Sequence, residues 1–144
     1  RYQMRAFIAA VLMLATQFAV AENISVADSQ IRQPMPGRTV TAGYLTLHNH
    51  TAVEQQLVAV SSAAFARIEL HQHSHRDGMM RMEQVDAITI AANASVSLAP
   101  GGLHLMLFEP VAALQPGQTV GLTLVFANGE QLAIEAPVVA MPKR

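Results

Sequence analysis

The chain has 144 residues, 51% of them hydrophobic, and its nine basic and ten acidic residues nearly balance. Such a chain fits one compact domain with a buried core, and the dispersed charge excludes a basic nucleic-acid-binding surface. The sequence contains no cysteine, which excludes disulfides and also the thiolate ligand that a blue-copper electron carrier needs.

Residues 1–21 have the layout of a secretory signal peptide, with a start at Met4. A basic beginning is followed by the apolar run Ala6–Leu14 and by Ala19-Val20-Ala21, an A-x-A cleavage site. We expect cleavage after this site to release residues 22–144 into the periplasm, with no N-terminal cysteine for lipid attachment. The alternative is a retained membrane anchor, although the apolar run is shorter than the ~20 residues that a span needs.

The rest of the chain reads as short strands separated by turns, with at most one turn of helix at 63–66. The predicted strands are Ile24–Ile31, Thr41–His50, Gln56–Ser61, Arg67–His75, Met79–Val85, Ala87–Ala91, Ser95–Leu98, Leu103–Glu109, Thr119–Ala127 and Gln131–Val139. Many short strands with one apolar face each predict a single all-β domain, either an antiparallel β-sandwich or a Greek-key barrel.

The strand 67–75 carries histidines on the face that points away from the core. Because side chains alternate between the two faces of a strand, Ile68 and Leu70 point inward. The outward face then carries Glu69, His71, His73 and His75. We expect Glu69 to be an isolated carboxylate, since no second acidic residue is paired with it in the sequence.

The strand 79–85 follows the turn signal Asp77-Gly78 and is rich in methionine. Met80 and Met82 share one face of this strand. The turn is expected to bring Met82 back beside His71, so that an imidazole and a thioether meet.

The strand 103–109 separates apolar residues from metal-capable ones. Its three leucines share the core face, which leaves His104 and Met106 together on the other, half-exposed face. Further along, the runs 119–127 and 131–139 alternate regularly around Asn128-Gly129, the strongest hairpin signal in the chain.

Four of these residues form a soft and uncharged donor set: His71, Met82, His104 and Met106. Two imidazoles and two thioethers suit Cu(I) better than zinc, calcium or magnesium. Thioether ligands also resist irreversible oxidation, which suits an oxidising compartment. Because no ligand is anionic, the site is expected to hold one Cu(I) less tightly than thiolates would, as a carrier does.

The spacing of the four residues, H-x10-M-x21-H-x-M, resembles the motif of the periplasmic copper chaperone family PCu(A)C. This spacing arises by chance in roughly one in a thousand chains of this composition. The segments around it also fit that family, with IELH at the first ligand, DGMMRM at the second and LAPGGLHLMLF at the last pair. The resemblance extends from Ile24 to about Val139.

The resemblance implies a cupredoxin-like barrel and a Cu(I) metallochaperone, not an enzyme. It also implies delivery of copper for cytochrome c oxidase assembly, to the oxidase copper domain or a Sco-type thiol protein. We expect the protein to be a monomer. Two alternatives remain open: a copper buffering or resistance protein without a dedicated acceptor, and a binding or adhesion sandwich whose His and Met are incidental.

Three neighbours of the motif remain candidates for auxiliary metal binding: His73, His75 and Met80. The two histidines extend the first ligand into H-x-H-x-H, which favours a second, weaker Cu(II) or zinc site. Simple solvation of these surface histidines is the alternative.

Overall fold

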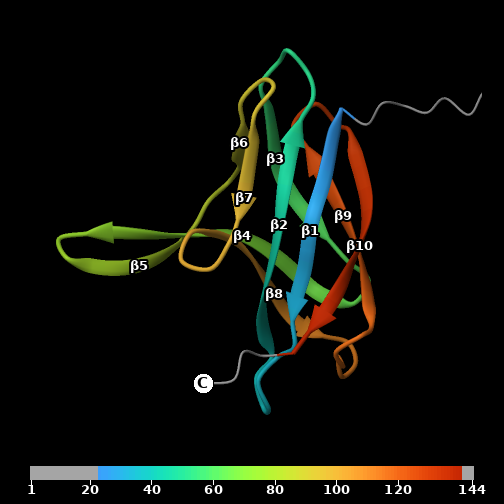
Figure 1. Ribbon diagram of the computed structural model, residues 1–144. Coiled ribbons are helices and arrows are strands. Elements are labelled where there is room, and N and C mark those ends of the chain that lie inside the picture. Colours follow the sequence, from blue (N-terminus) through green and yellow to red (C-terminus); the bar gives the residue numbers. More distant parts are fainter. Residues whose placement is uncertain (1–22, 141–144) are drawn as a thin grey trace, which may run out of the picture.

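The computed structural model describes residues 23–140, which form ten β-strands and no helix (Figure 1). The strands are β1 (Ile24–Arg32), β2 (Val40–Asn49), β3 (Gln55–Ser61), β4 (Phe65–Arg76), β5 (Met79–Gln84), β6 (Ile88–Ile90), β7 (Ser95–Leu98), β8 (Leu103–Pro110), β9 (Thr119–Phe126) and β10 (Gln131–Val139). Every predicted strand is therefore present, and the all-β prediction is confirmed. The predicted signal segment, residues 1–21, lies outside the described residues.

The strands pair in the order β5-β4-β8-β2-β1-β10-β9-β3-β6, and β7 pairs with β2 beside this path. All pairs are antiparallel except β1 with β10, where Ile31 lies opposite Val138 in a short parallel pair. The strand pairing is thus antiparallel apart from this short pair. The parallel pair joins the half of the sheet that holds β4 and β8 to the half that holds β9 and β3.

The core consists of the apolar faces that the two-residue period predicts. Leu105 and Leu107 of β8 are fully buried, as are Leu122 and Leu124 of β9 within a few per cent. These leucines belong to one continuous cluster that draws residues from both halves of the sheet. Burying such side chains is the main source of stability in a domain whose sequence holds no disulfide.

The single turn of helix that the sequence allowed at 63–66 does not form. Residues 63–64 form a turn, and β4 already begins at Phe65, whose side chain is buried in the core. The amide of Ala64 donates to Ser62 Oγ, which closes the turn without any helical hydrogen bond. Burial of the aromatic ring therefore outweighs the weak local preference of an alanine-rich segment for a helix.

The hairpin of β4 and β5 projects from the body of the domain as an arm (Figure 1). Asp77 and Gly78 both have positive φ, 54° and 76°, which is the geometry of a two-residue turn between twisted strands. The edge strand β5 pairs with β4 alone, and β8 pairs with β4 only as far as Gln72. Among the described residues 23–140, no helix is long and apolar enough to cross a membrane.

Candidate metal site

Strands β4 and β8 place two of the predicted ligands face to face. His71 of β4 is the direct antiparallel partner of His104 of β8. Their ring centroids lie 5.7 Å apart, with a tilt of 43° between the ring planes. Met106 lies on the same face, two pairs further along, opposite Glu69. Residues separated by more than thirty positions in the sequence thus meet on one face of the sheet.

The register of the hairpin places Met82 differently from the expectation. Because the two-residue turn pairs Arg76 with Met79, Met82 lies opposite His73, and His71 lies opposite Gln84. Met82 is therefore diagonal to His71 on the same face of the arm, not directly beside it. The Met82 side chain is 47% exposed, so it has room to approach the two histidines.

His71 makes a hydrogen bond that its sequence position did not suggest. Its Nε2 lies 2.9 Å from Oε1 of Glu69, while its Nδ1 is buried and has no hydrogen-bond partner. The second carboxylate oxygen, Oε2, accepts from Nε of Arg67 at 3.0 Å. The hydrogen bond from His71, followed by that from Arg67, lowers the pKa of Glu69. Glu69 therefore accepts hydrogen bonds from basic side chains at both carboxylate oxygens, next to the candidate site.

His104 is buried, with only 3% of its surface exposed, and not half-exposed as the strand pattern suggested. The imidazoles of His71 and His73 lie beside its ring and contribute to this burial. Its Nδ1 lies 3.2 Å from the carbonyl oxygen of Gly102. Burial lowers the pKa of His104, and the hydrogen bond to Gly102 opposes this shift only in part. His104 is thus kept in the neutral form that binds metal.

His73 lies closer to this site than its auxiliary status implied. Its ring is stacked on that of His104, with centroids 5.0 Å apart, and its Nδ1 is also buried without a hydrogen-bond partner. His75 and Met80 face each other further out on the arm, where both are exposed. The structure therefore brings His73 to the candidate ligands but leaves His75 and Met80 near the tip.

The donor types present here bear on which metal could fit. Within residues 23–140, no three His, Asp or Glu side chains are arranged as a metal-binding group. The candidate site accordingly relies on methionine sulfur as well as imidazole nitrogen. The unpartnered buried Nδ1 atoms of His71 and His73, on a strand face that also carries Met82 and Met106, match the needs of a soft monovalent ion that takes neutral donors.

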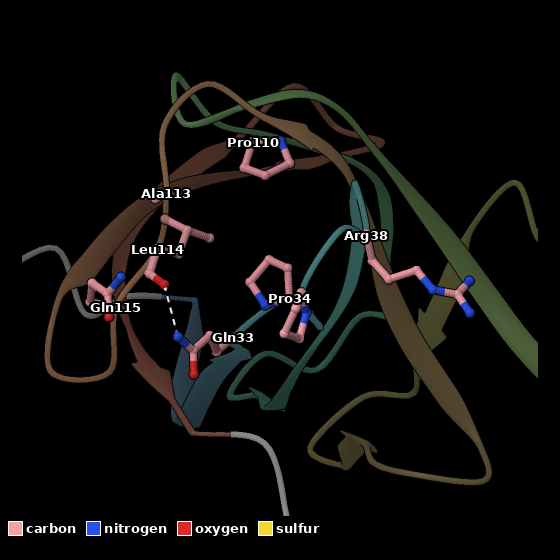
Figure 2. Close-up of a pocket in the computed structure, with 8 residues that line it drawn as sticks. Gln33, Pro34, Arg38, Pro110, Ala113, Leu114 and Gln115 are labelled. Atoms are coloured by element: carbon pink, nitrogen blue, oxygen red, sulfur yellow. Dashed lines mark hydrogen bonds between the residues drawn. The ribbon is translucent and has the colours of Figure 1, made fainter.

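The pocket in Figure 2 lies at the other end of β8 from this site. It is lined by Pro34, Arg38, Pro110, Leu114 and their neighbours, and Gln33 donates to the Leu114 carbonyl at its edge. Pro110 ends β8, whereas His104 stands near its beginning. None of the predicted ligands lines this pocket. The candidate site is thus separate from this pocket and lies on a strand face beside the exposed arm.

The remaining pair of histidines has other partners. His48 of β2 is hydrogen-bonded to the hydroxyl of Ser95. His50, which directly follows β2, is hydrogen-bonded to the hydroxyl of Ser25. Their rings lie 6.2 Å apart. They are not among the strand partners of His71 or His104.

The chain is similar to several known proteins. Residues 24–138 match the family model described as "Putative lipoprotein LpqE-like". The copper-bound PCuAC domain from PmoF2 is 27% identical, with a TM-score of 0.70 over 83% of this chain and 94% of that domain. The CuI form of DR1885 from Deinococcus radiodurans is 30% identical, with a TM-score of 0.67 over 87% of this chain and 85% of that one. An uncharacterized protein of Rickettsia prowazekii, RP573, is 28% identical over 83% of this chain and 78% of its own length. The predicted resemblance to PCuAC domains and the cupredoxin-like fold are confirmed.

Proposed function

Because the chain belongs to the LpqE-like family and its structural neighbours are PCuAC domains, we propose that it binds one Cu(I) ion and hands it on. The observation that carries this proposal is the pair of facing imidazoles, His71 and His104, on the strand face that also carries Met106. Copper is a cargo in this proposal. The protein itself is not an enzyme, and its similarity to copper-bound domains supports that reading.

The proposed ligands are His71, Met82, His104 and Met106. The first and third supply neutral imidazole nitrogens, and the pKa of His104 is lowered in a way that keeps its ring neutral. The other two supply thioether sulfurs, which carry no proton to lose and suit Cu(I). Because Met82 belongs to the edge strand of the arm, it would be the ligand most easily released during transfer.

A ligand set without negative charge also suits release. Thiolate ligands compensate the charge of copper and bind it more strongly, so an acceptor that contains cysteine can draw the ion from this site. The exposed side chain of Met82 would let such an acceptor displace this ligand first. We therefore propose transfer by stepwise ligand exchange to the copper domain of cytochrome c oxidase or to a Sco-type thiol protein.

One experiment tests binding, and a second tests transfer. Titration of the apo protein with Cu(I) against a chromophoric competitor should give one tight site per chain. No competition would exclude copper binding and favour the adhesion or general binding alternative. Mixing the Cu(I)-loaded protein with an apo oxidase copper domain or an apo Sco-type protein should then move the metal to the acceptor. Retention of the copper in the presence of both acceptors would favour the buffering or resistance role.

A second, weaker Cu(II) site is proposed around His73 and His75. The support differs between the two, since His73 stacks on His104 while His75 is exposed near the turn. Cu(II) prefers imidazole to thioether, so His73 is the better candidate, with His75 and Met80 as outer contacts. Electron paramagnetic resonance of His73→Gln and His75→Gln variants, each loaded with Cu(II), tests this assignment. A spectrum unchanged in both would contradict it.

The last part of the proposal concerns where the protein works, which we place outside the cytoplasm. Membership in a family named for lipoproteins supports an extracytoplasmic location. We propose the periplasm as the compartment, reached through cleavage of the signal segment after Ala21, and a monomeric mature protein. Amino-terminal sequencing of the exported protein should read Glu22 as the first residue, and size-exclusion chromatography should give the mass of one chain.

A further inference from the structure

The hydrogen bonds around His71 fix which of its ring nitrogens is free. The hydrogen bonds from His71 and Arg67 lower the pKa of Glu69. An ionised carboxylate accepts hydrogen bonds and cannot donate one. The Nε2 of His71, 2.9 Å from Oε1, must therefore carry the proton. The Nδ1 of His71 is buried and has no hydrogen-bond partner. In its neutral form, His71 therefore carries its free lone pair on Nδ1.

The hydrogen bond of His104 fixes the opposite arrangement. The carbonyl oxygen of Gly102 is an acceptor only, so the Nδ1 of His104, at 3.2 Å, must be the donor. The neutral form that burial favours then keeps its lone pair on Nε2. The two facing imidazoles are thus different tautomers, although both come from adjacent strands and lie on one face.

From these contacts we propose that the two histidines offer opposite ring nitrogens to copper, Nδ1 from His71 and Nε2 from His104, with Glu69 as the positioning residue for His71. This inference rests on the proposed function, because it concerns the same Cu(I) ligands. It adds a residue to the site that the H-x10-M-x21-H-x-M spacing does not include.

The position of Glu69 is itself fixed from a neighbouring strand. Its Oε2 accepts from Arg67, whose guanidinium lies 3.9 Å above the ring centroid of Phe108. Phe108 belongs to β8 and lies two positions beyond Met106. The chain of contacts from Phe108 through Arg67 and Glu69 to His71 thus ties the ring of one ligand to the strand that carries the other two. A cation stacked on an aromatic ring and bound to a carboxylate has little freedom to turn.

Glu69 also supplies charge where the ligands supply none. The carboxylate lies opposite Met106 and is hydrogen-bonded to His71, so it borders half of the proposed donor set. A metal-bound imidazole that donates its other N–H to a carboxylate becomes a more basic ligand, and loss of such a partner typically lowers metal affinity 10–100-fold. The proposed carrier therefore has one anionic group near its cation without a direct anionic ligand.

Long-range proton–nitrogen NMR spectra of uniformly nitrogen-15-labelled protein test the tautomers, first without metal and then with Cu(I). Without metal, His71 should show a protonated Nε2 and a bare Nδ1, and His104 the reverse. Cu(I) should then shift the Nδ1 signal of His71 and the Nε2 signal of His104. A protonated Nδ1 on His71 in the apo protein, or a copper shift at its Nε2, would overturn the inference.

Variants at Glu69 separate positioning from general structure. Glu69→Leu should mix the two tautomers of His71, leave His104 unchanged and weaken Cu(I) binding by about 10–100-fold. Glu69→Gln keeps an accepting oxygen and should restore most of the His71 tautomer, with a smaller loss of affinity. Glu83→Gln is the matched control, because Glu83 contacts Ser74 on the other face of the arm and should change neither property.

The outcomes also distinguish this inference from the proposed function. If Cu(I) shifts neither histidine, the proposed function fails and this inference fails with it. If Cu(I) binds but the His71 tautomer and the affinity are the same in Glu69→Leu as in the wild type, only the positioning role of Glu69 is overturned.

Discussion

At the residue scale, Met82 and Met106 are the side chains whose removal should separate copper binding from folding. Both lie outside the buried core cluster, and Met82 is 47% exposed. We expect Met82→Leu and Met106→Leu each to lower Cu(I) affinity by at least about tenfold, or about 1.4 kcal/mol, because a ligand is lost. Competition titration measures the affinity, and urea denaturation should show nearly unchanged stability. A variant that unfolds would show that its methionine is part of the core instead.

The matched control for Met106 is its neighbour in the chain. Leu105 is fully buried in β8, on the opposite face. Leu105→Ala should lower the free energy of unfolding by about 2–5 kcal/mol through the cavity it leaves. The fraction that remains folded should bind Cu(I) as the wild type does, which a titration at low temperature checks. Unchanged stability would contradict the assignment of this face to the core.

At the scale of a single element, the β4–β5 arm depends on the left-handed conformation of its turn. Gly78 has a φ of 76°, and a Cβ added there would meet no atom within 4 Å, so the cost of substitution is conformational and not steric. We expect Gly78→Ala to destabilise the arm by about 1–2 kcal/mol. Because the arm carries Met82 and His73, Cu(I) affinity should fall with it, as competition titration would show.

A second glycine hairpin provides the control for this element. Gly129 joins β9 to β10 with a φ of 90° and also has open space around it, but it is distant from the arm in the strand order. Gly129→Ala should cost similar stability, measured by urea denaturation, without a change in Cu(I) affinity. Equal losses of copper affinity in the two variants would argue against a specific role for the arm.

At the scale of the whole molecule, stability should depend on pH through His104. Burial lowers the pKa of this histidine below its usual 6.5 in the folded state, so the unfolded chain binds the proton first as the pH falls. Stability is therefore complete above pH 6.5 and decreases as the pH falls from there towards the lowered pKa of the folded state. Glu69 adds a further loss below pH 4.5, because its pKa is also lowered on folding.

Urea denaturation of the metal-free protein at pH 7.5, 6.5 and 5.5 measures the effect of His104. The midpoint should change little between pH 7.5 and 6.5 and should be lower at pH 5.5. His104→Asn should flatten this decrease, because the substituted side chain does not titrate. A midpoint that stays constant or rises as the pH falls would contradict the assignment of a lowered pKa to His104.

The sequence by itself determined the all-β fold and most of the candidate site. The two-residue alternation around Leu105 and Leu122 identified the core face, because a strand has only two faces and one must be buried. The motif spacing identified the proposed ligands, since only a few residue types suit Cu(I). The turn at Asp77-Gly78 was also readable, because glycine adopts positive φ at little cost.

Only the tertiary structure decided how these residues meet. The pairing of His71 with His104, the offset of Met82 to a place opposite His73, and the burial of His104 depend on the register between strands, which local sequence does not encode. The contacts of Glu69 with His71 and Arg67 depend on side-chain directions within one strand and on an aromatic ring in the next. Phe65 likewise extends β4 because it reaches a core built by distant strands, and burial of its ring outweighs the local preference for a turn of helix.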